Sequence, residues 1–152
     1  MFINPQIAIN EGWITGIVDP EKQVQPNAID FTLDKVFSVA VANAFIISEA
    51  GKVMRGGAPY GSVEDRASGL QFWNLKEGTL WDCLSDVYVD VPEGVACMLV
   101  PRSTFTRNGL FLTSGLYDSG FKGHIGFVLH NRAGLAKVGV GTRVGQVIFV
   151  ES

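Results

Sequence analysis

The stretch from Thr113 to Gly126 carries the residues of this chain best suited to chemistry. Glycines flank a single acid, Asp118, and an aromatic ring, Phe121. Glycine permits sharp turns and lets a ligand approach the backbone closely. A carboxylate in such a turn can orient or deprotonate a water molecule, although a turn aspartate often only bonds its own backbone. We interpret this stretch as the floor of a small-molecule pocket.

Two further sets of residues have the chemistry of phosphate binding. Arg102 and Ser103 follow an apolar run, Val95–Val100, and an arginine fork beside a hydroxyl matches phosphate oxygens. Arg143 and Gln146 follow a glycine turn and can reach phosphate as well. The plainer alternatives are an arginine paired with a surface carboxylate and a polar pair on the surface.

Asp30 lies where apolar and polar residues alternate, so it shares one face of a predicted strand with Thr32. There it can help to bind a cation through water, or it can cap a turn. No zinc pattern is present, since the chain has two histidines and two widely spaced cysteines. We expect Cys83 and Cys97 to be buried and reduced.

The length, composition and charge of the chain limit the classes of protein to which it can belong. The 152 residues suit one domain, and 47% of them are hydrophobic. The net charge of −3 argues against a general nucleic-acid binder. Neither a signal peptide nor an apolar run of about 18 residues is present. We expect a soluble, cytoplasmic protein with neither a membrane nor a nucleic-acid polymer as partner.

Short strands separated by glycine and proline turns must position these residues. A short helix is expected at 4–12, where Asn4 is suited to cap it, and one helical turn at 104–108. Residues 19–22 read as a turn, and about 42–75 as a loop or hairpin insertion. Strands are expected at 29–33, 36–42, 44–47, 78–84, 87–91, 95–100, 110–112, 125–129, 135–138 and 144–150. This pattern predicts a mainly-β distorted barrel or jelly roll with one or two short helices.

Together, the motifs resemble the trimeric dUTPase and dCTP deaminase superfamily. Pro101-Arg102-Ser103 looks like the PRS motif of that family, and the segment 115–123 looks like its uracil-pocket hairpin. The segment 141–146 looks like its G-x-R-x-x-Q motif. Residues 24–30 are similar to the deaminase branch. The resemblance covers nearly the whole chain except the residues at about 42–75.

The resemblance implies a β-rich homotrimer with active sites between subunits and a deoxyribonucleoside triphosphate as substrate. Members of the dUTPase branch cleave dUTP to dUMP and pyrophosphate with Mg²⁺. By carry-over, Asp118 is the general base, and Phe121 stacks under the deoxyribose and excludes a ribose. The hairpin backbone, with Thr113, Gly115 and Tyr117, would read the base.

The phosphate side of the implied site comes from the other motifs. The resemblance places Arg102, Ser103, Arg143 and Gln146 on the phosphates, with Mg²⁺ bridging their oxygens. Asp30 would act near the metal through water. Arg107 falls where the deaminase branch keeps a second arginine, which would reach the triphosphate or the partner subunit.

Other positions distinguish the two branches. The glutamate that shuttles protons in the deaminases aligns with Val128, which cannot carry a proton, and no other acid lies on that strand. The base-binding asparagine common in dUTPases has no clear counterpart near Leu112 and Thr113. Family members typically continue with a tail over a neighbouring site, whereas this sequence ends at Ser152, so we expect a wetter site.

Three hypotheses follow from this combination. The first is a nucleotide diphosphatase that hydrolyses dUTP, with dCTP as a second substrate to test. The second is a dCTP deaminase, or a bifunctional deaminase and diphosphatase. The third is a non-catalytic trimeric protein that binds nucleotides or serves a structural role.

Overall fold

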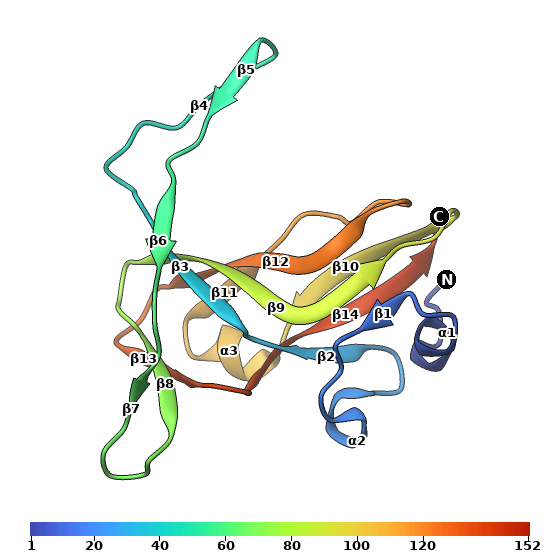
Figure 1. The fold of residues 1–152 in the computed structure, drawn as a ribbon, viewed down its shortest axis with the longest axis horizontal. Coiled ribbons are helices and arrows are strands. Elements are labelled where there is room, and N and C mark those ends of the chain that lie inside the picture. The colour runs from blue at the N-terminus through green and yellow to red at the C-terminus, as the bar shows by residue number, and fades with distance from the viewer.

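Two β-sheets packed face to face form the body of the protein in the computed structural model, which describes residues 1–152 (Figure 1). The larger sheet has the strand order β11-β12-β9-β3-β6, and β1 pairs with β9 beside this path. Its strands are β1 (Ile14–Thr15), β3 (Lys35–Val39), β6 (Gly57–Pro59), β9 (Leu80–Asp90), β11 (Leu110–Thr113) and β12 (Lys122–Asn131). Side chains along β9 alternate between buried and more exposed, as expected for a strand with one face on a core.

The second sheet is smaller and carries Asp30, Arg143 and Gln146 on its strands. Its order is β10-β14-β2, from β10 (Val95–Pro101), β14 (Arg143–Glu151) and β2 (Ile29–Thr32). The rings of Phe31 on β2 and Phe127 on β12 lie 5.1 Å apart, so the apolar faces of the two sheets meet there. The predicted mainly-β fold is confirmed as a distorted jelly roll whose sheets do not close into a barrel.

Three short helices accompany the sheets, one more than the upper limit predicted. They are α1 (Pro5–Asn10), α2 (Pro20–Gln23) and α3 (Ser103–Arg107). The additional helix is α2, which occupies the predicted turn at 19–22. It forms because the Asp19 side chain accepts a hydrogen bond from the Lys22 N–H and Pro20 suits the first helical position.

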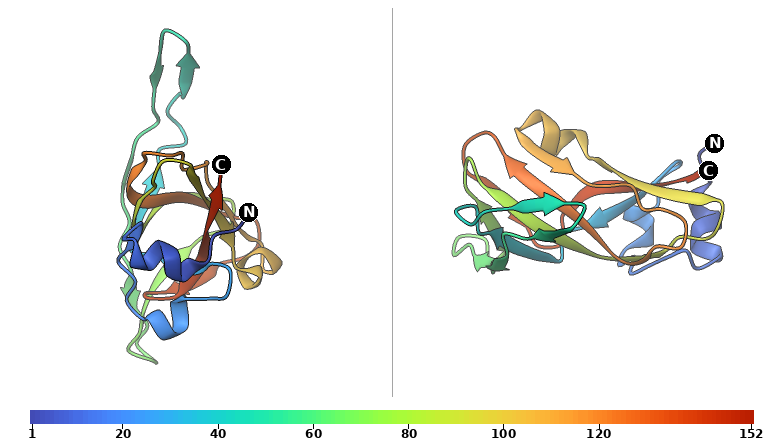
Figure 2. Two further views of the ribbon diagram at one scale, coloured as in Figure 1. Left: turned by 90° about the vertical axis from the view of Figure 1, so that its right-hand side faces the viewer. Right: turned by 90° about the horizontal axis from the view of Figure 1, so that it is seen from above.

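Only part of the region at about 42–75 leaves the body of the molecule, because β6 belongs to the larger sheet and Trp73 and Leu75 belong to the core. The hairpin of β4 (Ile46–Ser48) and β5 (Gly51–Val53) projects beyond both sheets (Figures 1 and 2), and every residue in these two strands is exposed. Further along, β7 (Val63–Glu64) and β8 (Gln71–Leu75) pair in a small sheet with β13 (Ala136–Gly139).

Both cysteines are free and buried, as predicted. Burial away from water raises the pKa of the Cys83 thiol and of the Cys97 thiol to about 12. Neither sulfur is therefore ionised at neutral pH. None of the helices is long and apolar enough to cross a membrane.

Candidate functional site

The glycine-rich segment between β11 and β12 lies along the free edge of β10. Tyr117 and Cys97 exchange two backbone hydrogen bonds, each 2.9 Å long. The Ser119 hydroxyl donates to the Val95 carbonyl at 2.7 Å, which fixes the segment a second time. The chain between the two strands is therefore held in place by a neighbouring strand.

A tight turn within this segment presents the acid that the sequence singled out. The N–H of Phe121 donates to the carbonyl of Asp118 at 3.0 Å, and Gly120 adopts φ = +87°, which favours glycine. The Asp118 side chain is exposed, and its carboxylate accepts no hydrogen bond and forms no ion pair within the chain. Its oxygens are thus free to accept a proton or a hydrogen bond from a ligand.

Tyr117 braces the hairpin from within. Its ring is buried, and its hydroxyl accepts from the Gly126 N–H at 2.9 Å and donates to the Gly126 carbonyl. Burial raises the pKa of the Tyr117 hydroxyl. The backbone groups and the hydroxyl of Tyr117 are therefore all engaged within the chain. Thr113 and Gly115 of the same segment are exposed.

A β-bulge gathers a second set of residues on the outer face of the smaller sheet. Side chains three positions apart on a regular strand point to opposite faces. Here the register slips between Arg143 and Gly145, so Arg143 lies opposite Thr32 while Gln146 lies opposite Asp30. The extra residue therefore turns Arg143 and Gln146 toward the same face as Asp30.

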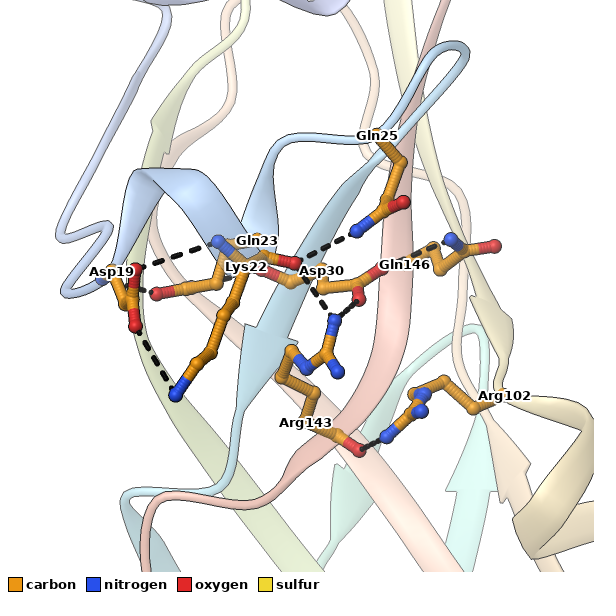
Figure 3. A network of polar contacts seen from close by, with 8 residues as sticks. All are labelled: Asp19, Lys22, Gln23, Gln25, Asp30, Arg102, Arg143 and Gln146. Atoms are coloured by element: carbon orange, nitrogen blue, oxygen red, sulfur yellow. Dashed lines mark hydrogen bonds and ion pairs between the residues drawn. The ribbon is translucent and has the colours of Figure 1, made fainter.

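Asp30 is the centre of the resulting network (Figure 3). Its carboxylate accepts 2.9 Å hydrogen bonds from Arg143 Nη1 and from Gln146 Nε2. Arg143 Nη1 also donates to the Lys22 carbonyl at 2.7 Å. Arg102 joins by donating from Nη1 to the Arg143 carbonyl at 2.9 Å. The structure thus brings together Asp30, Arg102, Arg143 and Gln146, four of the residues that the sequence singled out.

The remaining predicted phosphate ligands lie at the two ends of α3. Ser103 is the first residue of this helix and Arg107 the last, and both are exposed. Ser103 is adjacent to Arg102 in the chain, so its hydroxyl is available beside the network. Arg107 is one helical turn away, at the position expected to face either the triphosphate or another subunit.

The structure gives Asp30 a different environment from the one expected of a metal-facing carboxylate. The residue is 3% exposed, and both oxygens accept hydrogen bonds from protein groups. No group of three or more His, Cys, Asp or Glu side chains in the chain is placed to hold a metal ion. A magnesium ion near this network would therefore depend on ligands from elsewhere, such as phosphate oxygens and water.

Asp118 and the network lie on opposite sides of β10 within one chain. Tyr117 pairs with one edge of β10 at Cys97, whereas β14 and β2 extend from the other edge. Along the strand, Cys97 and Arg102 are separated by about 16 Å at roughly 3.3 Å per residue. The two halves of the predicted site are therefore apart in a single copy.

Sequence inspection overlooked two residues near the predicted site. Gln23 is 2% exposed and joins α2 to β2 through Asp30, but a lone glutamine in a turn carries no recognisable signal. Asp82 lies directly opposite Val128 on the neighbouring strand β9. The sequence placed no acid on the Val128 strand, and only the pairing of β9 with β12 shows that one lies beside it.

Comparison with known proteins gives consistent similarities. Residues 85–152 match a family model described as dCTP deaminase-like. A probable deoxyuridine 5'-triphosphate nucleotidohydrolase from Methanothermobacter thermautotrophicus is 30% identical over 113 residues, which are 74% of this chain and 69% of that protein. A protein of the same name from Methanococcoides burtonii is 24% identical over 145 residues, which are 94% of this chain and 81% of the relative.

The fold is similar to a solved enzyme as well. The crystal structure of 2'-deoxycytidine 5'-triphosphate deaminase from Agrobacterium tumefaciens superposes with a TM-score of 0.74 at 16% identity. The match covers 99% of this chain and 48% of that one, so the present chain spans about half of the solved protein. At this identity the similarity concerns the fold.

Proposed function

Since the chain belongs to the dUTPase and dCTP deaminase superfamily, we propose that it is a nucleotide diphosphatase that hydrolyses dUTP to dUMP and pyrophosphate. The observation that carries this proposal is the exposed carboxylate of Asp118, which has no partner in the chain and sits on a hairpin braced by Tyr117. The names of the archaeal relatives support the choice of dUTP.

In the proposed mechanism, Asp118 accepts a proton from a water molecule as the water oxygen bonds to the α-phosphorus. The bond between that phosphorus and the oxygen bridging to the β-phosphate breaks, and pyrophosphate leaves. Phe121, which is partly exposed and packs edge-on against Tyr117 at 4.8 Å, would lie under the deoxyribose. Thr113 and Gly115, which are both exposed, would contact the base.

The phosphates would lie on the network centred on Asp30. Arg102, Ser103 and Gln146 would contact phosphate oxygens, and Arg143 would contribute positive charge beside them. Mg²⁺ would neutralise charge on the phosphate oxygens and would be held mainly by those oxygens and water. This arrangement fits a chain with no cluster of three metal-binding side chains.

We place the complete site between copies of the chain, with Asp118 from one copy and the phosphate-binding network from another. Support comes from the separation of the two halves along β10. The outer face of the smaller sheet beside Gln146 is also apolar and incompletely buried. It consists of Ala96, Met98, Val100, Ile148 and Val150, which pair across β10 and β14. A homotrimer would cover this face and join the halves.

A second candidate function is deamination of dCTP. The specific observation in its favour is Asp82, which lies in register opposite Val128, the position aligned with the deaminase glutamate. Asp82 is exposed. Against it, Val128 itself is apolar, and a carboxylate on the adjacent strand must reach across a strand spacing of about 4.8 Å.

One experiment distinguishes these functions. The purified protein is incubated with dUTP or with dCTP, each with Mg²⁺, and pyrophosphate and ammonia are measured separately. We expect pyrophosphate from dUTP and no ammonia from dCTP. Ammonia from dCTP would establish the deaminase, and loss of that ammonia in Asp82→Asn would assign it to Asp82. Bound nucleotide with neither product would indicate a non-catalytic binding protein.

A further inference from the structure

Gln23 is a buried glutamine with every polar group of its side chain in use. It is 2% exposed and ends the short helix α2. Its Oε1 accepts from the N–H groups of Val18 at 2.9 Å and Asp19 at 2.8 Å, and its Nε2 donates to the Asp30 carbonyl at 2.9 Å. A single side chain therefore fastens the loop before α2, and α2 itself, to strand β2.

The strand position that Gln23 holds is the one that carries the Asp30 carboxylate. Asp30 in turn binds Arg143 and Gln146, and the Lys22 carbonyl of α2 accepts a second bond from Arg143. The α2 turn thus reaches Arg143 along two routes, one direct and one through Asp30. In Figure 3 these groups form one continuous chain of contacts from α2 to Arg102.

We propose that Gln23 is a positioning residue, which together with Asp30 orders Arg143 and Gln146 before the nucleotide binds. The proposal rests on the proposed function, because it assigns these two side chains to the triphosphate. A ligand that must itself order long side chains binds more weakly. Since water activation belongs to Asp118, the loss of this order should raise KM for dUTP and leave kcat little changed.

The sharpest perturbation is Gln23→Glu, which keeps the shape and both acceptor bonds but replaces the donor to the Asp30 carbonyl with a carboxylate oxygen. Two less ordered side chains predict a rise in KM for dUTP of about 5- to 100-fold, with kcat within about twofold of the wild type. Burial raises the pKa of such a carboxyl. Protonation restores the lost donor, so the ratio of variant to wild-type KM should fall as the pH is lowered.

Asn131→Asp is the matched control. Asn131 is also a fully buried amide with three hydrogen bonds to the backbone, from Nδ2 to Leu75 and Gly134 and from the Ala133 N–H to Oδ1. It lies on β12 and touches none of the network. The control should lower the melting temperature without raising KM. A second variant, Asp30→Asn, removes the charge opposite Arg143 and should raise KM in the same way.

The outcomes separate this proposal from the proposed function. If the wild type releases pyrophosphate and Gln23→Glu and Asp30→Asn keep its KM, the positioning role is refuted while the diphosphatase stands. An equal rise in KM for Asn131→Asp would also refute it, because general destabilisation would then explain the effect. If the wild type releases no pyrophosphate, the diphosphatase fails, and the same comparison is made on the Kd for dUTP by calorimetry. An unchanged Kd there refutes the positioning role.

Discussion

A site shared between copies predicts that two inactive variants restore each other. Asp118→Asn removes the proposed base, which typically costs about 10²–10⁴-fold in rate. Arg102→Ala removes hydrogen bonds from a charged group worth about 1.5–3 kcal/mol, or roughly 10- to 100-fold. Each variant alone should therefore release little pyrophosphate from dUTP.

The shared site also predicts how much activity a mixture of the two variants should recover. A working site needs Asp118 from a copy that carries Arg102→Ala and Arg102 from a copy that carries Asp118→Asn. With equal amounts and random assembly, each condition is met in half of the cases, so about one quarter of the sites should be intact. Pyrophosphate release should then recover to about one quarter of the wild-type rate, far above the mean of the two variants.

The assay needs proof that the copies exchange. The variants are unfolded and refolded together, or co-expressed with different tags, and the rate is measured at a dUTP concentration well below the KM of the wild type, where a loss of phosphate binding lowers the rate. Recovery of both tags in one assembly proves that the copies exchange. A mixture of wild type with Asp118→Asn controls for recovery of activity after mixing and should retain about half of the wild-type rate. If this control behaves as expected and the two variants together stay at the mean of their separate rates, Asp118 and Arg102 do not share a site across copies.

Three further predictions test other features. Met98→Lys places a charge on the outer face of β10, where the side chain is 37% exposed, and should reduce the mass measured by light scattering to that of the single chain; a trimeric mass would place the interface elsewhere. Burial raises the pKa of Cys83 and Cys97 to about 12, so the free energy of unfolding is at its full value below the pKa of the unfolded thiols and falls as the pH rises toward 12, by up to about 1.4 kcal/mol per pH unit for each thiol. Melting curves of Cys97→Val should therefore show a smaller loss of stability at alkaline pH than those of the wild type. An equal loss would contradict this cause. Gly145→Ala would place a Cβ 2.5 Å from the Phe31 ring and should lower the free energy of unfolding by about 1–3 kcal/mol in urea titrations; an unchanged midpoint would mean that Phe31 can move.

The sequence located the hairpin and its acid because glycine spacing reports backbone shape directly. Gly120 adopts the positive φ that its position in the turn requires. Asp118 belongs to the same turn, so the turn also determines where this acid lies. The strands of the core were likewise predictable from the pattern of apolar residues. Apolar and polar residues alternate along β9, which is typical of a strand with one buried face, and β10 is a continuous apolar run, which is typical of a buried strand. The local sequence pattern was sufficient for features that depend on a single strand or turn.

The orientation of Arg143 and Gln146 was not predictable in this way. Three positions apart on a regular strand, these side chains point to opposite faces, and the bulge that unites them depends on the pairing with β2. The role of Gln23 likewise depends on a tertiary contact with Asp30. For the same reason Asp82 went unnoticed beside Val128 until the pairing of β9 with β12 was known.

The β4–β5 hairpin should open more easily than the two sheets of the body. A hairpin of two strands is at best marginally stable in water, and all six residues of its strands are exposed. Its opening does not require the sheets to open, because β3 is held by β9 at one side and β6 pairs with β3 below the hairpin. Amide protons there should exchange with solvent while those of the sheets remain protected. A protease that cuts in the hairpin would leave two fragments still bound to each other through β3 and β6, so the chain can be nicked there and remain folded.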